Sequence, residues 1–158
     1  MSATVNFQFP DISLVNSEIK DPLFYFSDDE LNTELPVSFN VHLESVTASF
    51  VSFFLHIALF KEDVEKDKNI RLLHFDFQII LQYVEEIDNS IEQIEVKKLE
   101  LAHLLGAGII MTRGALKILL NNHYFSQFQP PIISPLEILK DQLSSSDDLF
   151  VLTLENEK

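Results

Sequence analysis

Residues 73–83, LHFDFQIILQY, carry the clearest strand pattern in the chain. In an extended strand, one face would present the apolar residues Leu73, Phe75, Phe77, Ile79, Leu81 and Tyr83. The other face would present the polar residues His74, Asp76, Gln78 and Gln82. Such alternation is typical of a half-buried strand. We therefore expect a strand here, with its apolar face packed on a core.

Further strands are expected upstream of this segment. Residues 37–44 alternate in the same way, and an irregular strand is expected over residues 7–14. Residues 50–60 are apolar on both faces, because Phe50, Phe54, Ala58 and Phe60 line the second face. A strand that is apolar on both faces is covered on both, and another subunit could supply the second cover. Short polar turns join the three runs at residues 37–44, 50–60 and 73–83, which favours an antiparallel meander.

A helical period replaces the alternation from about residue 90 to residue 121. All three glycines of the chain lie inside this segment, although glycine in a helix costs roughly 1 kcal/mol relative to alanine. Close approach of another backbone would explain them. One ridge of the helix carries, four residues apart, Ala102, Gly106, Ile110 and Gly114. We expect this ridge at an oligomer interface, on one long helix or on two shorter ones.

The last part of the chain contains a shorter helix. We expect it over residues 135–143, with Ser134 as the N-cap and Pro135 at the first helical position. Beyond it, residues 149–154 could form a short strand or a tail. Together these elements predict an α+β fold, with a single domain over residues 1–143 and an acidic C-terminal tail over residues 144–158.

The composition excludes several classes of function. A formal net charge of −14, from 25 acidic and 11 basic residues, disfavours nucleic acid and anionic membranes as partners. The chain has no cysteine, so disulfide and thiol chemistry are excluded. Neither a signal peptide nor a membrane-spanning run is evident, so we expect a cytoplasmic protein without membrane insertion.

Catalytic and metal-binding motifs are also missing. His42, His56 and His74 fall on the polar faces of three expected strands, but without the spacing of metal ligands. No serine nucleophile motif or glycine-rich phosphate loop is present. We therefore expect neither an enzyme nor a metal or cofactor site.

Apolar side chains are more numerous than a small core requires. The chain has 14 phenylalanines, and three aromatic residues, Phe24, Tyr25 and Phe26, follow one another in an expected loop. Core packing or a permanent subunit interface would account for part of these apolar side chains. The alternative for the others is a groove that accepts extended or unfolded polypeptide.

Several strings resemble the SecB family of protein-export chaperones. Residues 102–107, AHLLGA, look like the entry into that family's first long helix, and Arg113 lies where that helix carries an arginine. Phe125, followed by PPII at residues 130–133, is similar to the crossover before the second helix. The loop bracketed by Pro22 and Pro36 matches the crossover between the first two strands.

This resemblance implies a four-stranded antiparallel sheet with one long and one shorter helix packed on one side, assembled as a dimer of dimers. It implies an ATP-independent holdase that binds unfolded polypeptides or preproteins in apolar grooves, with SecA as a further partner. On that basis we expect clients at Phe24, Tyr25, Phe26, Phe50, Phe54 and Phe60, and SecA-like docking at Asp11 and Glu18. The acidic tail lacks the family's basic segment, which leaves open a SecB-shaped adaptor or structural subunit with one dedicated partner.

Overall fold

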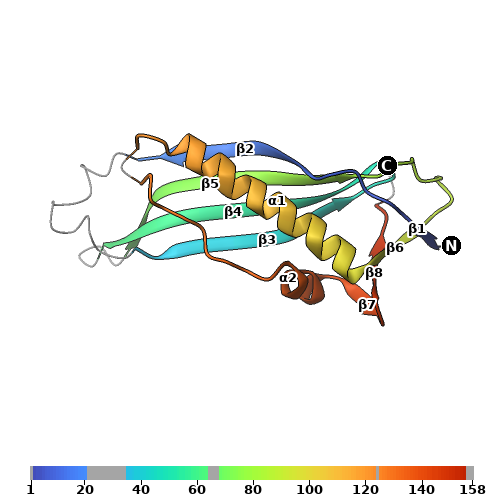
Figure 1. The fold of residues 1–158 in the computed structure, drawn as a ribbon. Helices are drawn as coiled ribbons and strands as arrows, with labels where there is room; N and C mark the ends of the chain where they lie inside the picture. The colour runs from blue at the N-terminus through green and yellow to red at the C-terminus, as the bar shows by residue number, and fades with distance from the viewer. Residues whose placement is uncertain (1, 21–34, 64–67, 124, 156–158) are drawn as a thin grey trace.

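The computed structural model describes residues 2–20, 35–63, 68–123 and 125–155. The fold is α+β, with two sheets of four strands each and two helices (Figure 1). Both helices lie on one side of the larger sheet.

The larger sheet is antiparallel, as expected. Its strands are β2 (Asp11–Ile19), β3 (Val37–Val46), β4 (Phe50–Asp63) and β5 (Lys68–Gln82). Their order is β2-β5-β4-β3, so β3, β4 and β5 form the predicted meander, while β2 and β3 are the two edges.

The core lies on the face of this sheet that the long helix covers. Phe53 of β4 pairs with Ile79 of β5, and Leu55 pairs with Phe77. All four side chains are at most 1% exposed. The alternation of residues 73–83 therefore marks the buried face correctly.

The long helix is continuous through its glycines. It is α1 (Lys98–Leu119), and the shorter helix is α2 (Pro135–Gln142), capped by the Ser134 side chain as predicted. The expected helical start near residue 90 is wrong. Residues Gln93–Lys97 form strand β6 instead, because their backbone pairs with a C-terminal strand that local periodicity cannot reveal.

A second, smaller sheet was not expected from the sequence. It has the order β1-β6-β8-β7, with β1 (Ser2–Thr4), β7 (Ser144–Ser146) and β8 (Leu149–Thr153) around β6. Phe150 and Leu152 of β8 are at most 1% exposed. Of the two alternatives for residues 149–154, the strand is therefore the one that forms, and ordered packing extends beyond residue 143.

The first strand of the larger sheet starts later than expected. Phe7 makes only an isolated bridge with Tyr83, and the two rings lie 5.3 Å apart. Phe9 is 74% exposed, and β2 begins after Pro10. Proline at this position removes a donor from the ladder, so the regular pairing with β5 begins at Asp11.

Candidate functional site

The inner face of α1 is held close to the sheet by a glycine. A Cβ atom on Gly108 would lie 2.5 Å from Cγ2 of Ile79. Leu101, Leu105 and Leu116 of the same helix are buried. By length and composition α1 is also apolar enough to cross a membrane, a property that it shares with the core helices of other folds.

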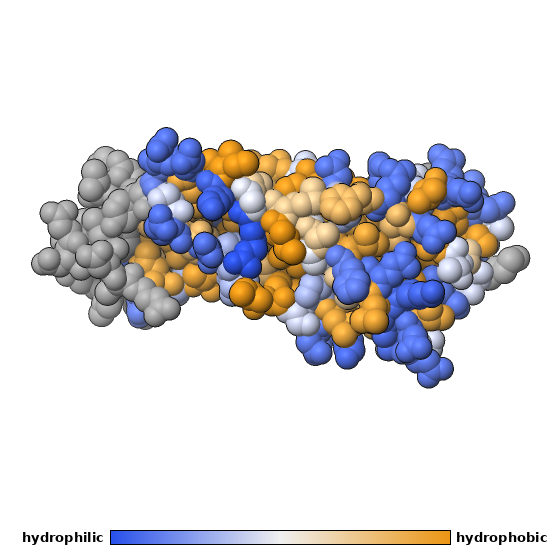
Figure 2. All heavy atoms as spheres, in the orientation of Figure 1, coloured by the Kyte–Doolittle hydropathy of each residue, from blue (hydrophilic) through white to orange (hydrophobic). Residues whose placement is uncertain are grey.

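The outer face of α1 is uncovered and apolar. Leu99 is 65% exposed, Ile110 is 69% exposed and Ile118 is 77% exposed. Figure 2 shows apolar surface along the middle of this side of the molecule, between hydrophilic areas. We call Leu99, Ile110, Gly114 and Ile118 the open face of α1. Exposed apolar residues gathered in one patch are typical of a binding surface.

A groove of about 490 Å³ separates α1 from the start of α2. It is lined by Leu99, Ala102, His103, Gly106, Ala107, Ile110, Ser134, Pro135 and Leu136. Gly106 lets the two helices approach, because a Cβ atom there would lie 3.3 Å from Cγ of Pro135. We call this hollow the α1–α2 groove. Apart from His103 and Ser134 its walls are apolar, so it suits an apolar side chain from another molecule.

A second groove, of about 580 Å³, borders the other half of the helix. Arg113 and Lys117 line it on the α1 side, and residues 126–130 form its opposite wall. Gly114 also lies here, and a Cβ atom on it would meet nothing within 4 Å. Among the described residues, no contact therefore explains the third glycine.

The four residues of the predicted interface ridge lie in different environments. Ala102 is buried and Gly106 faces α2 of the same chain, whereas Ile110 and Gly114 are exposed. The close approach that the glycines predict therefore occurs within the chain at Gly106 and Gly108. Only the end of the ridge remains available to a second copy.

Three of the expected client-binding residues lie on the opposite side of the larger sheet. Phe50, Phe54 and Phe60 alternate with the core residues of β4 and so point away from α1. All three are half-buried, and Phe54 packs against His42 with the ring centroids 5.3 Å apart. They do not join the α1–α2 groove. Phe24, Tyr25 and Phe26 lie outside the described residues.

The same face holds a pair of histidines. His56 Nδ1 donates a hydrogen bond to Oδ1 of Asp76, and its ring stacks on His74 at 6.2 Å between centroids. His74 is only 4% exposed, and its Nδ1 atom has no hydrogen-bond partner in the part of the chain that the structure describes. Among the described residues, no three His, Cys, Asp or Glu side chains are placed to hold a metal ion.

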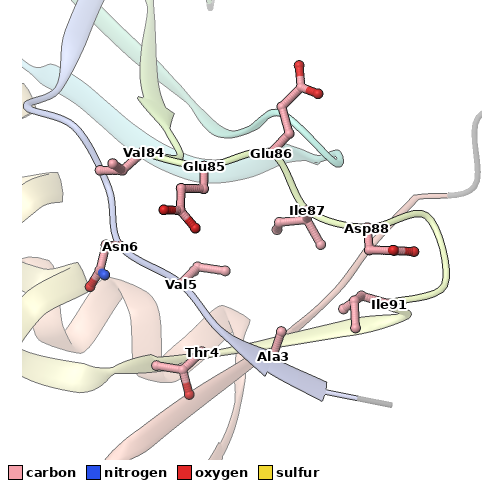
Figure 3. A pocket seen from close by; sticks show the side chains of 10 residues that line it. All are labelled: Ala3, Thr4, Val5, Asn6, Val84, Glu85, Glu86, Ile87, Asp88 and Ile91. Atoms are coloured by element: carbon pink, nitrogen blue, oxygen red, sulfur yellow. The ribbon is translucent and has the colours of Figure 1, made fainter.

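A third hollow, of about 350 Å³, lies near the N-terminus between residues 3–6 and residues 84–91 (Figure 3). Glu85 points toward it, whereas Glu86 points away. Hydrogen bonds from the backbone and side chain of Ser90 lower the pKa of Asp88. All three acids are exposed to solvent.

The expected docking acids are both on the edge strand β2. Asp11 and Glu18 are exposed, and Glu18 lies 3.8 Å from Nζ of Lys20. The register with β5 shifts at Val15, so both acids face the side away from α1, opposite Ile80 and His74. They are therefore brought to one face of one edge.

Sequence reasoning missed Leu99 and Ile118 as exposed residues. Both fit the apolar content of the helix, and the periodic pattern alone does not show which apolar residues lie outside the core. The detectable signal was that apolar residues occupy more of the helix than one face can bury.

No family model matches the chain, and no curated protein matches it at a significant level. The resemblance to the SecB family is therefore a prediction that rests on the short motifs quoted above.

Proposed function

We propose that this protein binds non-native polypeptides and keeps them from aggregating without ATP, as the resemblance to SecB chaperones implies. The observation that carries the proposal is the open face of α1 beside the α1–α2 groove. Covering a large apolar side chain contributes about 1.5–3 kcal/mol when it is fully exposed at the start. Leu99 and Ile110 are each about two-thirds exposed, so together they can hold an apolar segment with little sequence preference.

The charge of the chain supports the same proposal. A net charge of −14 keeps a protein with exposed apolar surface soluble. It also attracts segments with basic character. A binding surface of this kind needs no catalytic group.

Self-association belongs to the same proposal. Gly114 costs the helix roughly 1 kcal/mol, and no atom of the described chain approaches its Cβ position within 4 Å. The backbone of a second copy packed at Ile110 and Gly114 would account for it. Light scattering measures the mass directly, and a strictly monomeric protein would exclude this part of the proposal.

The test is suppression of aggregation of a reduced, unfolded client at stoichiometric amounts. Ile110→Asp places a charge beside the α1–α2 groove and is expected to abolish most of the suppression. Val84→Asp is the matched control, because Val84 is 58% exposed and lies near the N-terminal hollow of Figure 3. If the wild-type protein fails to protect unrelated clients but binds one folded partner, the adaptor function replaces this proposal.

A further inference from the structure

One stretch of this acidic chain contains no acidic residue. Residues 101–136 include neither aspartate nor glutamate, although 25 of the 158 residues are acidic and about six would be expected in a stretch of this length. Its only lysine or arginine residues are Arg113 and Lys117. The stretch covers most of α1 and the segment that returns from the helix toward α2 (Figure 1). Within it, an anion would meet cations and no carboxylates.

Both cations line the same hollow, the groove of about 580 Å³ between α1 and residues 126–130. We call it the Arg113 groove. Arg113 is half-buried and Lys117 is exposed. Over the ranges that the structure describes, neither of them forms an ion pair with a carboxylate. Gln127 and Gln129 add side-chain amides to the opposite wall.

The helix itself explains only one of the two charges. Lys117 lies in the last turn of α1, where a cation interacts favourably with the helix dipole. Arg113 lies before that turn, where the dipole effect has faded. The two residues are four apart, so their side chains are neighbours on the helix surface, and like charges at this spacing destabilise a helix. An anion between them would offset this repulsion.

The size and the lining of the groove indicate what carries the anion. Guanidinium and ammonium groups both bind carboxylates. Phe128 is half-buried and Ile110 is 69% exposed, so apolar surface lies beside the cations. A volume of about 580 Å³ falls within the range of sites for ligands much larger than an ion. These properties fit a carboxylate side chain on a polypeptide segment better than a free ion.

The Arg113 groove continues the α1–α2 groove along one side of the helix, because Ile110 lines both of them. Gly106 of the first groove lies about nine residues from the midpoint of Arg113 and Lys117, which corresponds to about 14 Å along a helix. An extended chain covers that length with about four residues. A segment with an apolar side chain in the α1–α2 groove would therefore reach the two cations about four residues away.

We infer that the Arg113 groove binds an aspartate or glutamate side chain of a bound polypeptide, about four residues from the apolar side chain that occupies the α1–α2 groove. The inference rests on the proposed function, because it concerns the same ligand, and it adds a charge preference at a second groove. The net charge of −14 favours basic segments at encounter. Salt screens that field beyond about 8 Å, so direct contact with Arg113 decides the preference inside the groove.

The probe is a peptide of glycine and serine, blocked at both ends, with one central leucine and a glutamate four residues to either side of it. A second peptide carries glutamine in place of both glutamates. NMR titration of the protein resolves millimolar affinities, and the Nε–H group of Arg113 is a local reporter. The wild-type protein is expected to bind the glutamate peptide about five- to ten-fold more tightly. The difference should shrink as salt is added.

Arg113→Gln removes the charge and is expected to weaken binding of the glutamate peptide about five-fold, while the glutamine peptide stays within about two-fold of wild type. Arg71→Gln is the matched control, because Arg71 is the other arginine of the chain and an exposed residue of β5. It should leave both affinities within about two-fold. The double variant Arg113→Glu with Lys117→Glu is expected to reverse the preference, so that a lysine peptide binds better than the glutamate peptide.

The inference is overturned if wild-type protein binds the glutamate and glutamine peptides equally, or if Arg113→Gln behaves like Arg71→Gln. It is also overturned if the preference persists when the glutamates directly flank the leucine, because the two grooves would then not act together. If Arg113→Gln lowers the mass measured by light scattering and leaves the peptide preference unchanged, a second copy supplies the carboxylate and the inference fails.

The proposed function can fail separately. Protection of unrelated unfolded clients together with equal binding of the two peptides would contradict only the carboxylate preference. Absence of client protection together with a preserved preference for the glutamate peptide would contradict the proposed function alone.

Discussion

Gly108 of α1 lies directly against Ile79 of β5, and a Cβ atom added to this glycine would stand 2.5 Å from Cγ2 of Ile79. Ile79 is completely buried, and its branched Cβ leaves it little rotamer freedom. The contact sets how closely the long helix approaches the sheet.

Gly108→Ala is therefore expected to destabilise the fold. Overpacking a core costs about 1–3 kcal/mol, and at this separation the cost exceeds the roughly 1 kcal/mol of helix propensity that alanine adds. The free energy of unfolding in urea is expected to fall by about 1–2 kcal/mol.

Gly114→Ala is the matched control for that substitution. Its Cβ atom meets no atom of the described residues within 4 Å, so the dissociated chain is expected to gain up to about 1 kcal/mol. Equal stabilities of the two variants would show that α1 does not sit as closely on β5 as described.

Gln142 is expected to be the residue that ties α2 to the edge strand β3. Gln142→Ala removes the hydrogen bonds to Leu43 and Val41 and is expected to cost about 1–3 kcal/mol, from two bonds of about 0.5–1.5 kcal/mol each. Amide exchange at Leu43 should accelerate, which is a local readout. Gln93→Ala alters an exposed residue of β6 and should change neither quantity. Unaltered exchange at Leu43 in Gln142→Ala would contradict the assignment.

The strands of the larger sheet were predictable because their signal is local. Residues 73–83 alternate with period two, and the same odd-numbered side chains are buried in the fold. The helix α2 was predictable for a similar reason, because Ser134 and Pro135 mark its start within two residues.

The second sheet and the exposed helix face depend on contacts distant in sequence. Val96 of β6 pairs with Phe150 of β8. The sequence of residues 93–97 alone does not predict this pairing. The exposure of Leu99 and Ile118 is likewise hidden from local sequence, because both residues continue the apolar pattern of the helix.

Tyr83 is expected to make stability fall at alkaline pH. Its hydroxyl donates to the carbonyl of Thr47 at 3.0 Å, and burial raises its pKa. In the unfolded chain tyrosine ionises near pH 10, so above about that pH the unfolded state loses its proton while the folded state retains it. The stability that the neutral side chain provides is present below this pH and is lost as the pH rises toward the folded-state value.

Tyr83→Phe separates the stability that comes from the hydrogen bond of the hydroxyl from the pH dependence that comes from its ionisation. At neutral pH it is expected to lower the free energy of unfolding by about 0.5–1.5 kcal/mol, through the lost hydrogen bond. Between about pH 9 and pH 11 it should lose less stability than the wild type, because it cannot ionise. Parallel profiles for the two proteins in urea titrations would contradict the burial of this hydroxyl.

The stacked histidines are expected to respond in opposite ways to the same substitution. His74 is 4% exposed with an unpartnered Nδ1 atom, and a buried polar group without a partner costs about 1–3 kcal/mol. His74→Leu removes that group and is expected to raise the free energy of unfolding by about 1 kcal/mol.

His56→Leu removes the hydrogen bond to Asp76, whose side chain is 15% exposed, and leaves a largely buried carboxylate without that partner. It is expected to lower stability by about 1–3 kcal/mol. Urea denaturation of both variants measures the signs, and a loss at His74 equal to that at His56 would mean that His74 has a partner in solution.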